Sequence, residues 1–332
     1  MKILVTGSAG FIGFHLSHRL LSRGDQVMGV DNLNNYYDVM LKKARLQHLM
    51  SHVSFQFVPL DLNHRELVGQ LFREQSFDCV VHLAAQAGVR YSLTDPFAYL
   101  DSNLLGFGHV LEGCRQQKNT PLIFASSSSV YGLHSTYPFK EDANVDHPIS
   151  LYAATKKANE LMAHSYAHLY RLPCTGLRFF TVYGPWGRPD MALFAFTQRI
   201  LSQQPIDVFN YGNMSRDFTY IDDIIDGVLL TIDHPLTADT AHIPYRIYNI
   251  GSHCPIRLTK FITILEKILN QKAIQNLLPM QPGDVAETFA DITQLKNDFG
   301  YEPKIDLETG VRRFVQWYMD YYGYPRTDNK IG

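Results

Sequence analysis

The segment SLYAATKKANE contains the pair of side chains best suited to acid–base chemistry, Tyr152 and Lys156. The segment lacks Gly and Pro and has helical character, so two positions four residues apart share one helix face. A phenol has an ordinary pKa of about 10, which is too high for a base near neutral pH, and a nearby ammonium lowers that pKa. The spacing therefore predicts a tyrosine base with a lysine partner. The alternative is a surface cation stacked on a ring.

Four consecutive serines, Ser126 to Ser129, follow the apolar run LIFA and precede VYG. In doubly wound sheets, ligands bind at the carboxyl ends of the strands, so hydroxyls at such an end are placed to meet a ligand. We expect one of them to hydrogen-bond a substrate hydroxyl and to help its proton move to Tyr152. The alternative is a hydroxyl-rich turn that caps its own backbone.

A glycine-rich stretch, TGSAGFIG, follows the first apolar run and opens the first helical segment. Gly7, Gly10 and Gly13 have the spacing GxxGxxG. Small residues allow the backbone to approach a pyrophosphate, whose charge is stabilised by the N-terminus of the following helix. A strand before the glycines and a helix after them favour a dinucleotide site over a tight turn without a ligand.

The second apolar run ends at Asp31, 18 residues past Gly13. A carboxylate there can accept both ribose hydroxyls of adenosine and would repel a 2′-phosphate. No Arg or Lys stands in the next ten residues to hold such a phosphate, so NAD is favoured over NADP. Asp61, after the third run, is a candidate contact for adenine or a simple turn residue. The remaining expected cofactor contacts are Phe11, Ile12, Asn32, Leu62, Leu83 and Ala84.

The first half of the chain alternates continuous apolar runs with amphipathic helical segments. Continuous apolar runs are typical of strands covered on both faces, and strand–helix alternation indicates a parallel sheet. The sequence therefore predicts an α/β fold with a doubly wound, Rossmann-type parallel sheet. The strands are expected at 2–6, 26–31, 54–59, 79–84, 121–126 and 174–179, and the helices at 11–23, 65–75, 96–116 and 152–170.

After residue 180 this alternation breaks. The stretch GPWGRPDM predicts a loop, and later segments predict a helix over 193–202, a strand over 246–250 and a helix over 259–269. We expect a cofactor-binding domain over 1–180 and a smaller C-terminal lobe over 181–332 that mainly binds substrate. Some of the later segments are expected to return to the main sheet.

The composition of the 332 residues is that of an ordinary globular protein, with 19% charged residues and a net charge of −2. No overall field draws such a chain to nucleic acid or to an anionic membrane. No apolar stretch reaches the length of about 18 residues that spans a membrane, and the N-terminus does not read as a signal peptide. The four cysteines show no metal-ligand spacing, so we expect no metal site and a reducing cytoplasm, with buried thiols at Cys79 and Cys174, which lie in apolar runs.

Through nearly its whole length the sequence resembles the extended short-chain dehydrogenase/reductase family, specifically its nucleotide-sugar 4-epimerases. The matching motifs include TGSAGFIG, HLAAQAGVRYS, SSSSVYG, YAATKKANE and RDFTYIDDI. DNLNNYYD together with RFFTVYGPWGRPDMA is similar to the UDP-glucuronate 4-epimerases. The resemblance implies NAD-dependent inversion of C4 on a UDP-hexuronic acid through a 4-keto sugar, in the supply of surface polysaccharide precursors. It also implies a homodimer formed by the helices at 96–116 and 152–170.

The resemblance further assigns roles to individual positions. Ser127 would be the catalytic hydroxyl, Tyr152 the base, and Lys156 its partner and a contact of the nicotinamide ribose. The remaining implied contacts are Asn103 on the cofactor side, Arg216 and Asp284 for UDP, and Tyr211 or Phe209 near uracil. Two positions depart from the UDP-galactose 4-epimerases. Thr181 replaces an Asn, which indicates a different environment at C6 of the sugar, and Gln281 replaces an Arg, which weakens the case for a phosphate contact there.

A C6 carboxylate would make the 4-keto sugar a β-keto acid, which decarboxylates when the C5–C6 bond aligns with the carbonyl π-system. An epimerase must hold the carboxylate out of that alignment. The candidates are the hydroxyls of Ser128, Ser129 and Thr181 and the guanidinium of Arg188, whose planar fork suits a carboxylate. Arg90, in the loop after HLAA, is a weaker alternative.

Three other functions stay open. A 4,6-dehydratase or a UDP-glucuronate decarboxylase is disfavoured, because such relatives have an acidic residue beside the catalytic hydroxyl, whereas no Asp or Glu lies between Ser126 and Gly132. A 4-epimerase of UDP-glucose or UDP-N-acetylglucosamine remains possible. A non-catalytic NAD-binding protein would be expected to lack a catalytic group, yet Ser127, Tyr152 and Lys156 are all present.

Overall fold

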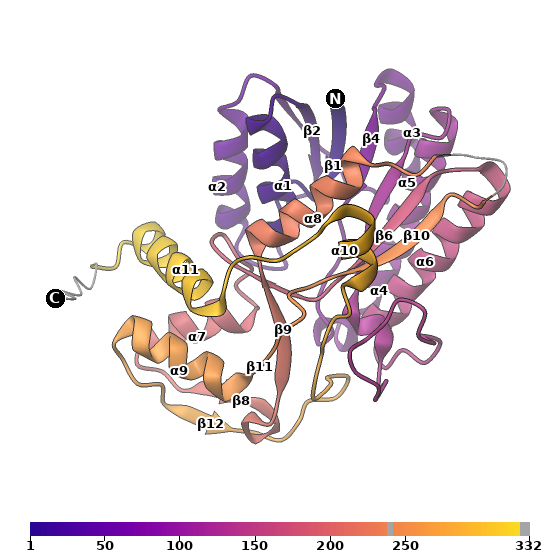
Figure 1. The fold of residues 1–332 in the computed structure, drawn as a ribbon. Coiled ribbons are helices and arrows are strands. Elements are labelled where there is room, and N and C mark those ends of the chain that lie inside the picture. The colour runs from indigo at the N-terminus through magenta and orange to yellow at the C-terminus, as the bar shows by residue number, and fades with distance from the viewer. Residues whose placement is uncertain (238–241, 326–332) are drawn as a thin grey trace.

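The computed structural model describes residues 1–237 and 242–325, and its centre is a seven-stranded parallel sheet (Figure 1). The strand order is β10-β6-β5-β4-β1-β2-β3, so the predicted doubly wound sheet is confirmed. Because β1 lies between β2 and β4, the loop that follows it opens at the point where the strand order reverses, which is where ligands bind in such sheets. The strands are β1 (Lys2–Thr6), β2 (Gln26–Asp31), β3 (Phe55–Pro59), β4 (Cys79–His82), β5 (Leu122–Ser127), β6 (Cys174–Phe179) and β10 (Tyr245–Ile250).

Helices cover both faces of this sheet, which explains why its strands are apolar throughout. Within β1, Ile3 and Val5 belong to one hydrophobic core, whereas Leu4 belongs to the core on the opposite face. This alternation follows from the two-residue period of a strand. The first face is covered by α1 (Phe11–Ser22), α2 (Val39–Met50) and α8 (Ile221–Asp233), and the second by α3 (Arg65–Glu74), α5 (Gly106–Gln116) and α6 (Leu151–Tyr170).

The helix expected over 96–116 is divided into three parts. It consists of α4 (Pro96–Tyr99), a π-helical segment η2 (Leu100–Leu105) and α5. Asp95 caps the first part, because its side chain accepts a hydrogen bond from the amide of Ala98 at 3.2 Å. Single π-helical turns occur often at functional sites. Here the turn carries the buried Asn103.

The chain after β6 forms a smaller lobe, drawn below and to the left of the sheet in Figure 1. Its strands form a three-stranded sheet in the order β11-β9-β7 and a pair, β12-β8. Phe194 of α7 packs edge-to-face on Phe314 and Tyr318 of α11, which closes the lobe. Its elements are β7 (Thr181–Tyr183), α7 (Ala192–Leu201), β8 (Ile206–Val208), η4 (Phe209–Gly212), β9 (Ser215–Tyr220), β11 (Pro255–Arg257), α9 (Leu258–Leu269), β12 (Gln275–Leu277) and α11 (Leu307–Tyr322).

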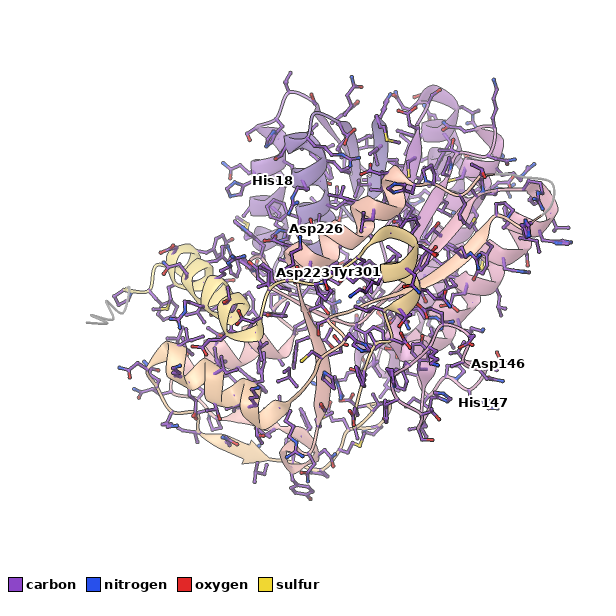
Figure 2. All side chains as sticks on the ribbon, viewed as in Figure 1. His18, Asp146, His147, Asp223, Asp226 and Tyr301 are labelled. Carbon is purple, nitrogen blue, oxygen red and sulfur yellow. The ribbon has the colours of Figure 1, made fainter. Side chains whose placement is uncertain are left out.

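Two segments of the second half return to the large sheet. Strand β10 pairs with β6 from Tyr245 to Ile250, and α8 packs on α1. Asp223 of α8 accepts hydrogen bonds from the amides of Lys304 and Ile305, both at 3.0 Å, which ties the C-terminal stretch to this helix. Figure 2 shows Asp223 beside Tyr301, at this crossing. These ties fix the smaller lobe against the edge of the sheet where the cofactor is expected.

Candidate active site

A cavity of about 710 Å³ runs along the carboxyl ends of the strands and into the smaller lobe. This volume lies within the range of about 300–1,000 Å³ that is typical of ligand pockets. Both the large sheet and the smaller lobe contribute walls. Nearly all of the residues singled out in the sequence line it. They are Gly7, Gly10, Phe11, Ile12, Gly13, Asp31, Asn32, Asp61, Leu62, Leu83, Ala84, Arg90, Ser127, Ser128, Ser129, Tyr152, Lys156, Thr181, Arg188, Phe209, Arg216 and Asp284. Asn103 and Tyr211 do not line it.

The glycine-rich loop fits the diphosphate of a dinucleotide. Gly7 has φ +73°, which favours glycine, and a Cβ atom on Gly13 would overlap the carbonyl oxygen of Gly7. The loop therefore turns tightly beneath the first turn of α1, whose N-cap Gly10 offers no side chain to the free amides. Those amides and the helix dipole form a site for an anion.

Asp31 lies at the adenosine end of the cavity. Its carboxylate accepts hydrogen bonds from the amides of Leu33 at 2.8 Å and Ala9 at 3.1 Å, so it is held against the glycine-rich loop. Lone pairs remain for two ribose hydroxyls. Asn32 donates to Asp61 at 2.9 Å and joins this end to the loop after β3. The residues present thus fit a dinucleotide that lacks a 2′-phosphate.

Lys42 is a cation of this end that the sequence argument did not consider, because it stands eleven residues after Asp31. Its ammonium donates to the backbone and side-chain oxygens of Asn34, both at 2.7 Å. Burial lowers the pKa of Lys42 to about 8. The ammonium therefore holds the loop after β2 and is not free to hold a phosphate.

Ser127, Tyr152 and Lys156 meet at the centre of the cavity. Ser150 caps α6 by accepting a hydrogen bond from the amide of Ala153 at 3.1 Å, which fixes the helix that carries Tyr152 and Lys156. Burial raises the pKa of Tyr152, while a hydrogen bond with Ser127 and the positive charge of Arg188 lower it. The predicted tyrosine, lysine and serine are therefore brought together.

One expectation about these residues is wrong in this structure. The ammonium of Lys156 donates to the carbonyl of Ala125 at 2.9 Å, and burial lowers the pKa of Lys156 to about 8. The cation that lowers the pKa of Tyr152 is Arg188, and burial outweighs it. Desolvation of a phenol in an apolar setting disfavours the phenolate, which explains why a lysine one helical turn away does not suffice.

Two residues behind the cavity hold the catalytic helix. The Tyr99 ring packs edge-to-face on Tyr152 with 6.0 Å between ring centroids. Asn103 donates to the hydroxyl of Thr155 at 3.0 Å and to the carbonyl of Gln86 at 3.0 Å. Asn103 thus supports the loop after β4 from behind. Tyr99 was not predicted, and its place in an ordinary helical pattern gave no signal.

A buried ion pair supports the serine run. Glu160, one turn past Lys156, accepts two hydrogen bonds from Arg178, at 2.8 and 2.9 Å, and one from Ser126 at 2.6 Å. Both charged side chains are less than a twentieth exposed. The sequence argument did not include this pair, although an arginine inside the apolar strand CTGLRF was a usable signal.

The far end of the cavity carries the residues expected to bind UDP. Arg216 donates to Asp284 at 2.8 Å, and the Arg90 guanidinium lies 4.7 Å from the centre of the Phe209 ring. Of the two aromatic residues expected near uracil, only Phe209 faces the cavity. Tyr211 is 60% exposed at the tip of the lobe, because the left-handed backbone of the turn directs it outward. Gln281 does not line the cavity either.

The expectation for Arg188 requires a correction. Its Nε and Nη2 atoms donate to the two oxygens of Asp190 at 3.0 and 2.6 Å, and Tyr36 donates to Asp190 at 3.1 Å. One edge of the guanidinium is therefore already bound to a carboxylate of the chain. Arg188 lines the cavity as predicted, but this edge is not free to hold a substrate carboxylate bidentately.

The described residues, 1–237 and 242–325, contain no group of three or more His, Cys, Asp or Glu side chains that could hold a metal ion. Across the same residues, no helix combines the length and apolar character needed to cross a membrane. Cys79, Cys114 and Cys174 are buried, and Cys254 is exposed; all four are free thiols.

Comparison with known proteins agrees with this geometry. A model described as the NAD dependent epimerase/dehydratase family matches residues 3–251. UDP-glucuronate 4-epimerase 1 of Arabidopsis thaliana is 49% identical over 98% of this chain and 78% of its own length. UDP-glucuronic acid 4-epimerase from Bacillus cereus, solved with UDP-glucuronic acid and NAD, superimposes with a TM-score of 0.90 at 35% identity, covering 97% of this chain and all of that one. UDP-glucose 4-epimerase from Thermotoga maritima, solved with UDP-glucose, gives 0.87 at 29% identity, covering 97% of this chain and 100% of that one.

Proposed function

The chain belongs to the NAD-dependent epimerase/dehydratase family, and we propose that it is an isomerase that interconverts UDP-glucuronate and UDP-galacturonate with bound NAD. One observation carries the proposal. Tyr152 lines the same cavity as the glycine-rich loop and Asp31, which fit a dinucleotide, and as Arg216 and Arg90, which are expected to meet UDP. A sugar joined to UDP would therefore lie over the phenol.

The chain holds the cofactor through the glycine-rich loop, with Asp31 on the adenosine ribose. When bound, NAD supplies a nicotinamide ring that accepts hydride from C4 of the sugar and later returns it. Lys156 contacts the nicotinamide ribose. Residues 1–180 bind mainly the cofactor, and residues 181–332 bind mainly the nucleotide sugar. Arg216, Asp284 and Phe209 hold the UDP portion, with Arg90 above the Phe209 ring.

Tyr152 acts as the base and acid of the reaction. Its phenolate takes the proton of the 4-hydroxyl while C4 is oxidised, and Ser127 hydrogen-bonds the same hydroxyl and stabilises the oxygen of the 4-keto sugar. The planar sugar then turns and presents its other face, and Tyr152 returns the proton. Burial raises the pKa of Tyr152, so the nearby charge of Arg188 supports the phenolate.

Recognition of a uronic acid comes from the wall of the cavity that faces C6. Ser128, Ser129 and Thr181 offer hydroxyls there, and Arg188 offers the part of its guanidinium that Asp190 does not bind. Charge-assisted hydrogen bonds of this kind are about twice as strong as neutral ones. They hold the carboxylate away from the alignment that leads to loss of CO₂.

A second candidate is a 4-epimerase of neutral UDP-sugars such as UDP-glucose or UDP-N-acetylglucosamine. The observation that favours it is the Arg188–Asp190 pair, which cancels the positive charge at the C6 wall. A decarboxylase is disfavoured, because no acidic residue lies between Ser126 and Gly132. A non-catalytic NAD-binding protein would not need the assembled Ser127, Tyr152 and Lys156.

The test is to incubate the purified protein with UDP-glucuronate without added cofactor and to resolve the products by anion-exchange chromatography and proton NMR. UDP-galacturonate as the product supports the proposal. UDP-xylose would indicate a decarboxylase, and turnover of UDP-glucose alone would indicate the neutral-sugar enzyme. Absence of turnover with every UDP-sugar would leave only the binding protein.

We further propose that the protein is a homodimer in a reducing cytoplasm. Large apolar side chains are exposed on the segment 96–105 and on α6, namely Phe97, Leu105, Leu161 and Leu169. Pairing of these two elements with those of a second copy would cover them. The four free thiols agree with a reducing compartment. Light scattering would give the mass in solution, and L161E combined with L169E should yield the monomer.

A further inference from the structure

Three loops that are far apart in the sequence meet at one wall of the cavity. We call the meeting point the loop junction and define it by Tyr36, Gly88, Arg188 and Asp190. Tyr36 comes from the loop after β2, Gly88 from the loop after β4, and the other two from the loop after β7. The first loop directly follows Asp31, so the junction connects the cofactor end of the cavity with the sugar site.

The contacts of the junction form a short polar chain. Tyr36 donates to Asp190 at 3.1 Å, and Asp190 accepts two hydrogen bonds from Arg188 at 3.0 and 2.6 Å. Burial raises the pKa of Tyr36 to about 12, and Asp190 adds to this, so the phenol stays a donor. A Cβ atom on Gly88 would lie 3.3 Å from the Tyr36 oxygen and 3.6 Å from Arg188 Nη2, which shows that this backbone closes the junction.

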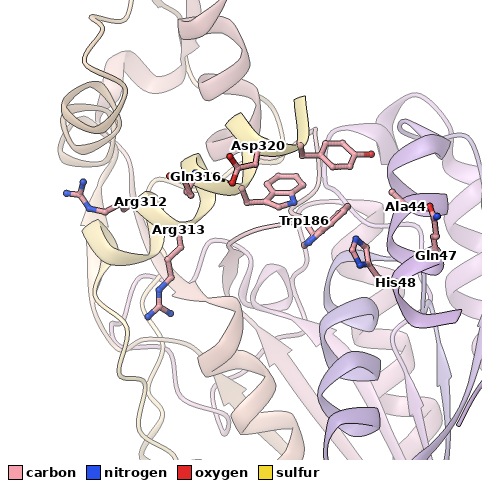
Figure 3. A pocket seen from close by; sticks show the side chains of 10 residues that line it. Ala44, Gln47, His48, Trp186, Arg312, Arg313, Gln316 and Asp320 are labelled. Atoms are coloured by element: carbon pink, nitrogen blue, oxygen red, sulfur yellow. Dashed lines mark hydrogen bonds between the residues drawn. The ribbon is translucent and has the colours of Figure 1, made fainter. Parts of the chain in front are cut away.

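The loop that carries Arg188 is also anchored from behind. The fully buried Arg45 donates to the carbonyl of Ala9 in the glycine-rich loop at 2.9 Å and to the carbonyl of Trp186 at 2.6 Å. Trp186 has φ +61°, and its indole lies in a surface groove between α2 and α11 (Figure 3). There its ring centroid is 5.1 Å from that of His48 and 5.2 Å from that of Trp317. The backbone of the loop is thus held on both sides. The Arg188 side chain is oriented mainly by Asp190, with a longer hydrogen bond of 3.4 Å from Nη2 to the carbonyl of Ala87.

We propose that Tyr36 and Asp190 are positioning residues for Arg188, and that the orientation they impose decides whether the 4-keto uronate keeps its C6 carboxylate. The proposal rests on the proposed function and deepens it. Asp190 holds the Nε–Nη2 edge of the guanidinium, so the substrate carboxylate meets the remaining Nη1 from a fixed direction. In the pair with Asp190 the Arg188 side chain is 20% exposed and lines the open cavity, so a guanidinium released from Asp190 has room to turn.

The side reaction that a misplaced carboxylate allows is chemically complete within the sugar. When the C5–C6 bond aligns with the 4-keto group, that bond breaks, and its electron pair moves into the carbonyl to form an enolate. Carbon dioxide leaves, and C5 takes a proton from water. The product is a UDP-4-keto-pentose. No oxidant or reductant is consumed in this step.

The experiment compares three variants of the full-length, NAD-containing protein on UDP-glucuronate labelled with ¹³C at C6. Tyr36→Phe removes only the hydroxyl, and Asp190→Asn removes the charge. Tyr91→Phe is the matched control, because the Tyr91 ring packs on Tyr36 with 4.7 Å between centroids, while its hydroxyl donates to Asp95. The quantity measured is the amount of ¹³CO₂ released per UDP-galacturonate formed. If Tyr36 and Asp190 had only a structural role, the substitutions would change the rates of CO₂ release and of UDP-galacturonate formation by the same factor.

We expect CO₂ release per epimerisation to rise about tenfold in Asp190→Asn, which corresponds to about 1.4 kcal/mol, and a few-fold in Tyr36→Phe, because Asp190 bonds the guanidinium directly and Tyr36 only supports Asp190. Tyr91→Phe should match the wild type, and Asp190→Glu should restore part of the fidelity. If Asp190→Asn fails to fold, the product ratio of Tyr36→Phe alone tests the proposal. Equal product ratios in Tyr36→Phe and the wild type would overturn this inference, whereas a wild type that makes no UDP-galacturonate would overturn the proposed function itself.

Discussion

The ammonium of Lys156 donates a hydrogen bond to the backbone carbonyl of Ala125, 2.9 Å away. Ala125 stands two residues before Ser127 in β5, so this bond fixes the catalytic helix to the strand end that carries the serines. Burial lowers the pKa of Lys156 to about 8, which still leaves the side chain mostly protonated at neutral pH. The lysine thus keeps a positive charge at the base of the cavity and at the same time sets the height of Tyr152 above the cofactor groove.

Replacing Tyr152 with Phe should lower kcat by about a hundredfold to ten-thousandfold, because this is the contribution that a general acid–base group makes. The ring remains, so its packing on Tyr99 is kept. We expect the NAD content of the purified protein and its melting temperature to be unchanged. Turnover of UDP-glucuronate and absorbance of the released cofactor are the measurements.

The control for this variant is Tyr166→Phe, on the same helix. The Tyr166 hydroxyl donates to Glu112 at 3.2 Å, away from the cavity. Its loss should change kcat by no more than about twofold, because this single part-buried hydrogen bond does not reach the cavity. Retained activity in Tyr152→Phe would falsify the assignment of the base.

Replacing Gly13 with Ala should remove the cofactor. The new Cβ atom would overlap the carbonyl oxygen of Gly7, which is backbone and cannot turn aside. The glycine-rich loop must therefore open, and the amides at the start of α1 move away from the diphosphate. We expect purified Gly13→Ala protein to contain no NAD and to show no epimerisation until NAD is added in large excess.

Gly69→Ala is the matched glycine substitution. Gly69 lies inside α3, and its Cβ would meet only the flexible end of Arg73 at 3.1 Å. Alanine should stabilise this helix by about 0.5–1 kcal/mol and leave the NAD content unchanged. A Gly13→Ala protein that keeps its full complement of NAD would contradict the role given to the loop.

The strands of the large sheet were predicted well because both of their faces are buried. The apolar runs at Lys2–Thr6, Gln26–Asp31 and Cys174–Phe179 have the bounds that were expected. Helix α2 escaped prediction for the opposite reason. Lys42 and Arg45 occupy buried positions in it, where they bind loop carbonyls, so their charges hide the helical period.

The sequence predicted which residues belong to the candidate site, but not which of them contact one another. Motifs place the glycines, Asp31, the serines, Tyr152 and Lys156 at the ends of strands, and a parallel sheet brings those ends together. The contact between Tyr36 and Asp190, the partner of Arg188, could not be predicted in the same way. Tyr36 and Asp190 are 154 residues apart, and their contact depends on how three loops pack. For the same reason the direction of Tyr211 was not readable from its position beside Phe209.

Replacing Glu160 with Gln should destabilise the fold by about 3–5 kcal/mol, because it leaves the buried charge of Arg178 without its partner. The hydroxyl of Ser126 also loses a charged acceptor. We therefore expect kcat to fall as well, through a less ordered Ser127. Urea denaturation and steady-state turnover measure the two effects.

The control is Glu308→Gln, which removes an exposed carboxylate. Glu308 accepts from Lys267 at 3.1 Å, and the two side chains are 41% and 70% exposed. Its loss should change the free energy of unfolding by less than about 1 kcal/mol. If both variants lost a similar amount of free energy of unfolding, burial would not determine how much the Glu160–Arg178 pair contributes to stability.

The pH dependence of stability should contain a contribution from His15. Burial lowers the pKa of His15 from 6.5 to about 4, although its hydrogen bond with the carbonyl of Pro185 opposes this. The folded state therefore keeps His15 neutral at pH values where the unfolded chain binds a proton. Stability is fully present above pH 6.5 and is lost as the pH falls toward 4, at up to about 1.4 kcal/mol per pH unit. Below that value both states are protonated, and the loss stops.

His15→Gln tests this contribution, because an amide can donate to Pro185 but does not titrate. The free energy of unfolding is measured by urea titration at several pH values between the two pKa values, with the wild type alongside. We expect the free energy of unfolding to change less steeply with pH in the variant. The two slopes should differ by nearly the amount that one bound proton contributes, about 1.4 kcal/mol per pH unit. His82, whose pKa burial lowers to about 3, and His18, whose pKa burial also lowers, are kept in both proteins and contribute to the slope that remains. Equal slopes would contradict this contribution, because they would mean that His15 has the same pKa in the folded and the unfolded protein.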